Sequence, residues 1–242
     1  MLKGTVLAAL LAFTQLGFAT TWGTTTVPDP VNEKETCEVA EPASSGSYIY
    51  SWPGKYEQVF WPVTEQNGIW FCQKSGFTAF IGDFDDISAS ERKAITAYLA
   101  ANFKGEATIE DKLALLAGIY ALRNKGELFR NRLLRVLAYW YEDLGNAQRA
   151  SGLRKEALKG ILSALDGKLS EQRRLEYMYV ACNYHRYFGA VEASESCVNQ
   201  LKVELAASKD EKLKDFVSYL SELLSETPKI KPGTKLNVES DS

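Results

Sequence analysis

The sequence has very little histidine, since His185 is the one histidine in 242 residues. Histidine changes charge near neutral pH and is the commonest metal ligand, so its scarcity excludes most acid–base and metal chemistry. A basic excess is also missing, because the formal net charge is -3. Domains dedicated to nucleic-acid binding normally carry a strong basic excess, so we expect no nucleic-acid partner.

Catalytic motifs are missing too. The sequence contains no G-x-S-x-G, no H-E-x-x-H and no G-x-x-x-x-G-K-[ST]. Residues 90–93 read S-x-x-K by chance, since the companion motifs of that enzyme class do not follow. The acidic Asp83, Asp85 and Asp86 lack the glycine and the spaced ligands of a calcium loop, and they precede a predicted helix, whose dipole favours them. We therefore expect no enzyme, no metal site and no cofactor.

Long apolar runs are lacking outside the N-terminus. Lys3 precedes an apolar run from Thr5 to Ala19 that ends in the small-x-small pattern of Gly17, Phe18 and Ala19. The run has about 15 residues, fewer than the roughly 20 that a membrane-spanning helix needs. The sequence predicts a signal peptide over residues 1–19 and a periplasmic or secreted protein without membrane insertion after cleavage. An uncleaved anchor is the alternative.

Charge is distributed unevenly along the chain. Residues 20–91 contain 11 acidic and 3 basic residues, whereas residues 123–174 contain 12 basic and 6 acidic ones. The two parts therefore carry opposite charge. This favours either attraction between them within the molecule or a basic surface for an acidic partner.

Residues 20–87 combine short apolar pieces with prolines and glycines, which is typical of strands and turns. Eleven aromatic residues lie between Tyr48 and Phe84, and Trp52, Trp61 and Trp70 are among them. Few aliphatic residues are available there, so we expect a small β/loop module with an aromatic core. A sugar-binding platform is the alternative for these rings.

Helical patterns replace this composition after Ile87. Ser88 with Glu91, and Thr108 with Asp111, have the spacing of capping boxes. The first helix is predicted over 88–103, and Gly126 is placed to end the second. Five more are predicted over about 128–144, 147–165, 171–188, 191–206 and 209–225. We expect a helical domain over 88–226 and a disordered tail over 227–242.

The helices contain a repeat that resembles the tetratricopeptide pattern, in which small residues let paired helices approach closely. The first copy matches at Leu134, Leu137, Ala138, Tyr141, Gly145, Ala150, Ala157 and Leu158. A second, less regular copy has Met178, Ala181, Cys182, His185, Gly189, Ala193 and Cys197. The predicted fold is mainly α, with tetratricopeptide-like hairpins after a small aromatic-rich β/loop module. A generic helical bundle is the alternative.

Four cysteines in an exported chain indicate two disulfides among three possible connectivities. Their clustering favours pairing between near neighbours. Cys182 and Cys197 lie about equally far from a predicted turn at Gly189 and Ala190, so an antiparallel hairpin places them at the same height. Buried free thiols are the alternative.

Three stretches carry a resemblance to a known family: VPDPVN (27–32), FCQKSGFTAFIGDF (71–84) and the helical stretch 177–201. They are similar to an uncharacterised bacterial family in which a pair of Cys-Pro-x-Cys zinc motifs precedes tetratricopeptide-like helices. The resemblance covers most of the chain after residue 19. It implies this architecture and partner binding, and it implies no reaction.

The zinc ligands of that family are largely lost here. Its four cysteine positions are occupied by Asp29, Asn32, Cys72 and Ser75, which leaves too few thiolates for a tetrahedral zinc site. The resemblance then implies that Cys37, a few residues after the first motif, bridges to Cys72. Such a bridge would join the same two loops covalently.

A tetratricopeptide hairpin lines its concave groove with its first helix, at positions spaced by 3 and 4 residues. This spacing gives eight predicted partner-binding residues: Arg132, Arg135, Tyr139, Glu142, Glu176, Tyr179, Asn183 and Arg186. Arginine binds carboxylates and asparagine pairs with peptide backbone, so the set suits an acidic or C-terminal peptide segment. A solvated face that binds nothing is the alternative. We expect charge reversal at both Arg135 and Arg186 to leave thermal stability almost unchanged.

The predicted function is an exported interaction or scaffold protein that binds a protein or peptide in this groove. The alternative is a carbohydrate- or cell-wall-binding module, with a cryptic hydrolase activity that uses carboxylates such as Asp83 and Asp85. A row of exposed tryptophans would favour the alternative, and their burial would count against it.

Overall fold

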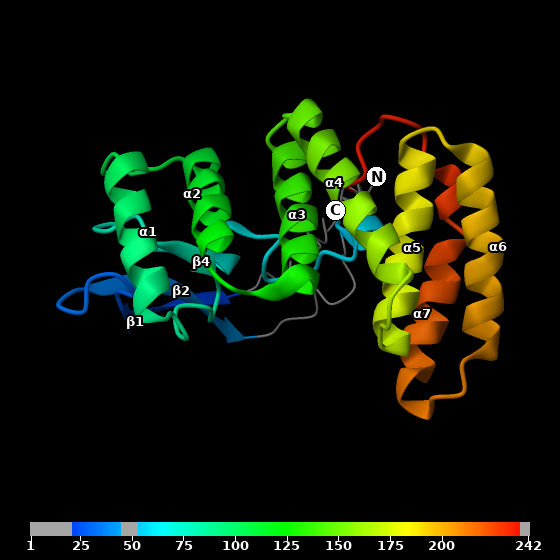
Figure 1. Ribbon diagram of the computed structural model, residues 1–242, viewed down its shortest axis with the longest axis horizontal. Coiled ribbons are helices and arrows are strands. Elements are labelled where there is room, and N and C mark those ends of the chain that lie inside the picture. The colour runs from blue at the N-terminus through cyan, green and yellow to red at the C-terminus, as the bar shows by residue number, and fades with distance from the viewer. Residues whose placement is uncertain (1–20, 45–52, 238–242) are drawn as a thin grey trace, which may run out of the picture.

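The computed structural model describes residues 21–44 and 53–237. The predicted signal peptide lies outside the described residues. Within them, four short strands precede seven α-helices (Figure 1). The prediction of a mainly α fold with a small N-terminal β module is therefore confirmed.

The N-terminal module holds two antiparallel two-stranded sheets. They pair β1 (Thr21–Pro28) with β2 (Thr36–Ser44), and β3 (Ile69–Phe71) with β4 (Thr78–Phe80). The ring of Phe84 meets Trp70 at a centroid distance of 5.2 Å and Phe77 at 5.0 Å, both edge to face. Such contacts stabilise beyond the area they bury, and they form the core of a segment that is poor in aliphatic residues.

The helices follow one another in a row from α1 to α6, with α7 packed beside α5 and α6 (Figure 1). Their bounds are α1 (Ala89–Asn102), α2 (Ile109–Leu122), α3 (Gly126–Asp143), α4 (Ala147–Leu165), α5 (Glu171–Tyr187), α6 (Val191–Ala207) and α7 (Lys214–Leu224). The most extensive helix contacts join α3 to α4 and α5 to α6. These are two consecutive antiparallel hairpins.

Two predicted helix boundaries are wrong. Gly126 does not end α2, which stops at Leu122, and instead it begins α3. The helix predicted over 209–225 is divided into a 3-10 turn, η4 (Glu211–Leu213), and α7. Asp210 causes this division, because its side chain accepts the N–H of Lys212 and starts a separate short turn.

Each hairpin turns at a glycine. Gly145 after α3 has φ +80°, and Gly189 after α5 has φ +77°, a left-handed conformation that side chains with a Cβ rarely adopt. The next N–H reaches back to the helix, as Ala190 N to His185 O at 2.9 Å. Both turns are therefore tight, and the paired helices run side by side from the turn onward.

Two disulfides cross-link the described residues. Cys182 on α5 bonds to Cys197 on α6, with 5.3 Å between Cα atoms, and Cys37 on β2 bonds to Cys72 after β3, with 4.9 Å. Both predicted pairings are confirmed. In the chain-entropy description, loops of these lengths contribute about 3 and about 4 kcal/mol respectively.

The buried apolar residues form two clusters. One joins the β module to α1, α2 and α3, and it crosses the boundary expected at residues 87 and 88. The other joins α4 to α7 and includes Ile230 and Leu236 near the C-terminus. The module is thus packed into the helical region and shares its core.

Both predicted capping boxes form. Ser88 caps α1 with Glu91, and Thr108 caps α2 with Asp111. Glu91 also accepts the N–H of Asn124 at 2.8 Å and so ties α1 to the connection after α2. That N–H, followed by the hydroxyl and the N–H of Ser88, lowers the pKa of Glu91 to about 2.

We expect Glu91→Gln to lower the free energy of unfolding by about 1 kcal/mol at neutral pH, the usual contribution of a helix cap. Because the pKa of Glu91 is depressed from its ordinary 4.5 to about 2, the ionised carboxylate stabilises the fold above pH 4.5. This stabilisation is lost as the pH falls towards 2. Denaturant unfolding across this range measures the difference between the two proteins. The exposed Glu106→Gln is the control, and a difference that persists unchanged at low pH would contradict the assignment.

Candidate functional site

A short turn of the N-terminal module enters the helical region. This inserted turn (residues 54–59) contains η2 (Lys55–Glu57) and closes through an antiparallel bridge between Gly54 and Val59. A Cβ on Gly54 would lie 2.5 Å from the carbonyl oxygen of Val59, so glycine is required there. The turn packs against α5 (Figure 1).

The helices hold the backbone of the inserted turn by its carbonyl groups. Arg135 on α3 donates from Nη1 to the carbonyl of Glu57 at 2.7 Å. Asn183 on α5 donates from Nδ2 to the carbonyl of Tyr56 at 2.9 Å. These contacts define an inner face of the hairpins, formed by α3 and α5, that binds peptide backbone.

Residues of α4 and α5 bind the carboxylate of Glu57. Arg154 on α4 donates from Nε to Oε1 at 2.9 Å and from Nη2 to Oε2 at 2.7 Å. The hydroxyl of Tyr184 donates to Oε1 at 2.7 Å, and the ring of Tyr187 lies 4.8 Å from the guanidinium. Glu57 and Arg154 are fully buried. A two-point arginine contact of this kind is among the strongest that a carboxylate receives.

Burial and the charge of Glu57 both shift the pKa values of the residues that bind it. Burial by itself lowers the pKa of Arg154, but the charges and hydrogen bonds of Glu57 and Glu142 outweigh it, and the pKa is raised. Burial, followed by the negative charge of Glu57, raises the pKa of Tyr184 well above its usual value. Arg154 is therefore charged and Tyr184 is neutral at any physiological pH.

The C-terminal segment (residues 225–237) contacts another part of the inner face. Glu142 accepts the N–H groups of Leu236 and Asn237 at 2.9 and 2.8 Å. Thr227 donates to Asn183 Oδ1 at 2.7 Å, and Arg186 donates to the carbonyl of Pro228 at 3.0 Å. Two separate stretches of the chain thus lie in the groove that was predicted for a partner.

The prediction of a disordered tail from Thr227 is therefore wrong over residues 227–237. Thr227 begins a 3-10 turn, η5 (Thr227–Lys229), and the side chains of Ile230 and Leu236 are buried against the second core cluster. Isolated apolar residues anchor this segment to the core. Because they follow no periodic pattern, the sequence does not predict that the segment is ordered. Residues 238–242 lie outside the described residues.

The eight predicted partner-binding residues have three different environments. Five are buried in contact with the chain itself: Arg135, Tyr139, Glu142, Tyr179 and Asn183. Arg186 and Glu176 are half-buried and paired within the protein. Arg132 is exposed. Arg135 and Arg186 both donate to main-chain carbonyls of the protein, which argues against the expectation that charge reversal there leaves stability unchanged.

Several residues of this site have no signal in the sequence. Glu57 lies in an irregular stretch, and Arg154 falls on α4, where hairpin spacing assigns no groove residue. The opposite charges of residues 20–91 and 123–174 are the one indication, because they favour attraction within the molecule. The Glu57–Arg154 and Asp83–Arg123 ion pairs are contacts of this kind.

Three arginines lie on α3 and at the start of α5. Arg135 on α3 and Arg173 on α5 share one carboxylate, since Glu176 accepts from Arg135 at 2.8 Å and from Arg173 at 2.6 Å. The charges of both arginines and of Glu176 act on Arg132, which also lies on α3. We call Arg132, Arg135 and Arg173 the arginine cluster. Among the described residues, Arg132 has no hydrogen-bonded or ion-paired partner.

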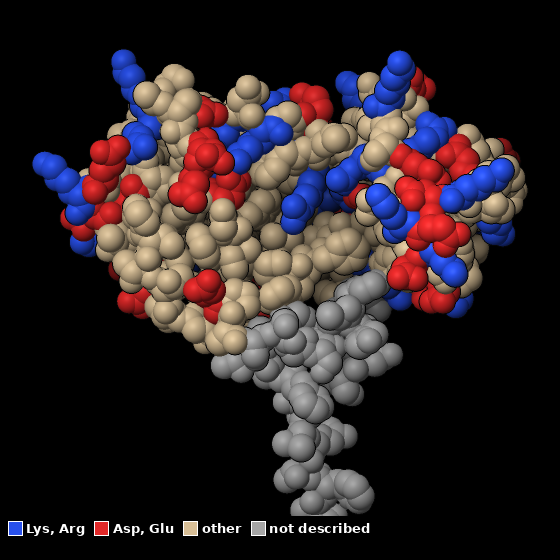
Figure 2. All heavy atoms as spheres, turned by 90° about the horizontal axis from the view of Figure 1, so that it is seen from below, with Lys and Arg blue, Asp and Glu red and all other residues tan. Residues whose placement is uncertain are grey.

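Figure 2 looks at the helix ends that carry this cluster. Blue Lys and Arg atoms lie in the hollow between the two halves of the molecule, and blue and red side chains are mixed on the outer surfaces. Burial, followed by the charge of Arg135, lowers the pKa of Arg132. Arg132 is therefore partly desolvated and lies near a like charge.

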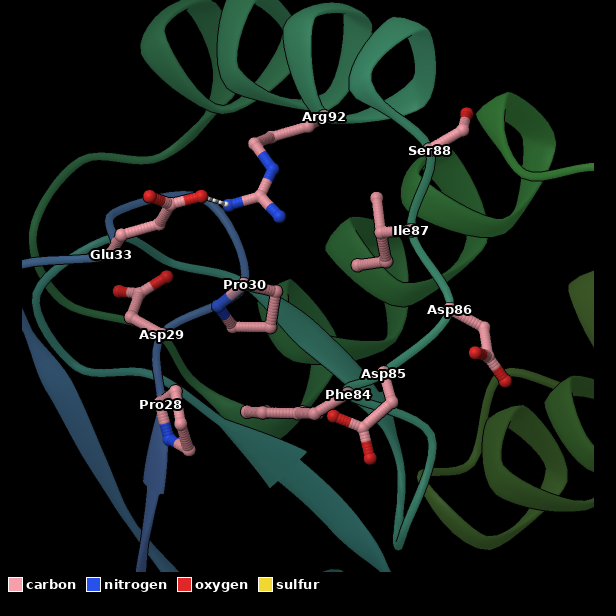
Figure 3. A pocket seen from close by; sticks show the side chains of 10 residues that line it. All are labelled: Pro28, Asp29, Pro30, Glu33, Phe84, Asp85, Asp86, Ile87, Ser88 and Arg92. Carbon is pink, nitrogen blue, oxygen red and sulfur yellow. Dashed lines mark hydrogen bonds and ion pairs between the residues drawn. The ribbon is translucent and has the colours of Figure 1, made fainter.

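A second concavity lies where the β module meets α1. Its volume is about 620 Å³, and Figure 3 shows Glu33 and Arg92 paired across one end, with Phe84, Ile87 and Pro30 as apolar walls. The Arg92 Nη1 atom is 2.7 Å from Glu33 Oε1. The acidic side chains point in different directions, so they do not converge on a cation.

The contacts of the predicted hydrolase and sugar-binding residues are largely structural. Asp83 pairs with Arg123 at 3.0 Å and with Lys125 at 2.7 Å, so it holds the module against α2 and α3. Trp70 donates to the carbonyl of Ala40 and is half-buried. Trp52 lies outside the described residues. These contacts do not favour the carbohydrate alternative.

Three potential metal ligands meet within the described residues. Oxygen or sulfur atoms of Asp29, Cys37 and Cys72 lie within 4.8 Å of one another, and all three residues are buried. The two sulfurs are joined as a disulfide and supply no thiolate. His185 lies apart, half-buried on α5, where burial lowers its pKa.

None of the helices in residues 21–44 and 53–237 has the length and apolarity needed to cross a membrane. Comparison of the chain with protein-family models, with curated proteins and with solved structures finds no match. The resemblance to the zinc-motif family therefore stays a prediction, and the function has to be inferred from the site itself.

Proposed function

We propose that this protein is an exported, non-enzymatic interaction protein that binds a protein or peptide partner on the inner face of its tetratricopeptide-like hairpins. The partner binds at the end formed by the arginine cluster, beside the inserted turn. No metal or cofactor takes part in this role.

The way in which the inner face holds the inserted turn carries the proposal. Arg135 and Asn183 bind successive carbonyls, and Arg154 with Tyr184 binds a carboxylate. These are the contacts that a groove makes to a peptide ligand. Arg135 also contacts Glu176 of the arginine cluster, so the part of the face that holds the inserted turn is continuous with the cluster.

Export is supported by two disulfides, because such bonds persist in oxidising compartments such as the periplasm or the cell exterior. The N-terminal apolar run with its small-x-small end supports the same conclusion.

Site-specific photo-crosslinking in intact cells tests the proposed function. Leu128 is 45% exposed and lies one helical turn before Arg132, so a photoreactive amino acid at this position faces the same side of α3. We expect irradiation to join this position to one defined protein, identified by mass spectrometry, and we expect Arg173→Gln to reduce the yield.

The same photoreactive group in place of Val203 on α6 is the matched control, because that side chain is 68% exposed and far along the chain from the cluster. An adduct of equal yield from both positions would indicate non-specific collision. The absence of any protein adduct at residue 128 would overturn the proposal.

A further inference from the structure

From the arginine cluster we infer that the partner segment is acidic, an extended peptide stretch whose Asp and Glu carboxylates bind Arg132 and Arg173. This inference rests on the proposed function, since it names the chemistry of the partner for that same surface.

Hydrogen-bond donors outnumber acceptors in the cluster. Three guanidinium groups have fifteen N–H donors in all, at five per arginine. Their acceptors among the described residues are the carboxylate of Glu176 and the carbonyl of Glu57. The Nε of Arg135 is buried without an acceptor, and Arg132 has none among the described residues. Additional carboxylates would supply the acceptors that this surface lacks.

Aromatic rings hold the guanidinium groups in place. Arg132 lies over Phe80 at 6.0 Å from the ring centroid, and Arg135 and Arg173 both lie 5.8 Å from the centroid of Tyr177. A guanidinium that packs on a ring by its face keeps its N–H edges available. A carboxylate can then bind two parallel N–H groups at little cost in side-chain entropy.

Electrostatics favour an anion at this place. Glu176 is one negative charge against three positive ones, so the cluster has an excess of two charges. Partial desolvation and the neighbouring Arg135 already disfavour the charged form of Arg132. A bound carboxylate would offset both effects, and its attraction is stronger in the hollow than on an open surface.

A peptide fits better than a free ion because of what lies next to the cluster. Arg135 binds the carbonyl of Glu57 with Nη1 and the carboxylate of Glu176 with Nη2. An extended segment along α3 and α5 would therefore continue the line of peptide that the inserted turn begins. Its carboxylates would meet Arg132 and Arg173, the two members of the cluster that reach solvent.

The probe is a fluorescein-labelled hexapeptide of alternating Glu and Asp whose terminal charges are blocked. Fluorescence anisotropy measures its binding to the protein. The matched control peptide has Gln and Asn in the same order. We expect the acidic peptide to bind at low salt at least about tenfold more tightly than the amide peptide, and to weaken as salt is added.

Two protein variants locate the site. Arg132→Glu should weaken binding of the acidic peptide by about tenfold or more, because it replaces attraction with repulsion. Arg130→Glu makes the same charge change two residues away on the opposite side of α3, and we expect less than about a twofold effect. Both side chains are exposed, so circular dichroism should find both variants folded.

Equal affinity for the two peptides would overturn the inference, and so would equal effects of the two variants. Displacement of the peptide by inorganic phosphate at comparable concentration would also overturn it, because the site would then hold a free anion. If Leu128 crosslinks a partner but the acidic peptide does not bind, the inference fails and the proposed function stands. If no partner is crosslinked, the proposed function itself fails.

Discussion

Replacing Arg154 with methionine is expected to lower the free energy of unfolding by about 4 kcal/mol. The guanidinium is completely buried and pairs with both Glu57 and Glu142, at 2.7 and 2.5 Å. Methionine fills much of the volume but leaves two buried carboxylates without their cation, and an uncompensated buried charge costs about 3 to 5 kcal/mol. Urea unfolding followed by tryptophan fluorescence measures the change.

Glu57→Gln should cost less, about 3 kcal/mol, because Arg154 keeps Glu142 as a partner. The control is Glu127→Gln, which removes an exposed pair with Arg130 and should change stability by no more than about 0.5 kcal/mol. Losses below about 1 kcal/mol for both buried variants would mean that the inserted turn is not a stabilising part of the fold.

The parts of the fold that depend on neighbouring residues could be predicted from the sequence. Ser88 with Glu91 locates the start of α1, because a capping box lies within four residues. The Cys182–Cys197 bridge follows from a tight turn and from helical rise, so it needs only the local geometry of one hairpin.

The occupant of the groove could not be predicted in the same way. Asn183, one of the predicted residues, does bind peptide backbone, but the carboxylate of Glu57 is bound by Arg154, which was not predicted for the groove. Glu57 and Arg154 are 97 residues apart, and no spacing rule connects a turn in an irregular module to a position on α4. Hairpin spacing identifies which residues face inward, and it carries no information on which segment covers them.

The C-terminal segment illustrates a second limit. A stretch with Pro228, Pro232 and several charged residues has the composition of a disordered tail. It is ordered because a surface already exists for it: Glu142 offers a buried carboxylate to two N–H groups, and the core accepts Ile230 and Leu236. Complementarity of this kind arises only in the folded molecule, so composition alone cannot indicate it.

Leu236→Ala is accordingly expected to lower the free energy of unfolding by about 3 kcal/mol. Its side chain is 2% exposed, and truncation of a buried leucine costs about 2 to 5 kcal/mol through lost burial and the cavity that remains. The loss should fall at the lower part of that range if the segment relaxes into the space. Thermal or urea unfolding of the full chain measures it.

Lys235→Ala is the matched control, because the adjacent side chain is exposed and its distance to Asp143 is 3.9 Å. We expect a change of less than about 0.5 kcal/mol for this variant. If Leu236→Ala changed the free energy of unfolding as little as Lys235→Ala, residues 225–237 would not be anchored on the inner face. Glu142 and Asn183 would then lie open beside the arginine cluster, and the surface available to a partner would extend along the whole of α3 and α5. A loss near 3 kcal/mol for Leu236→Ala alone instead restricts the partner to the end of the groove that Arg132 and Arg173 form.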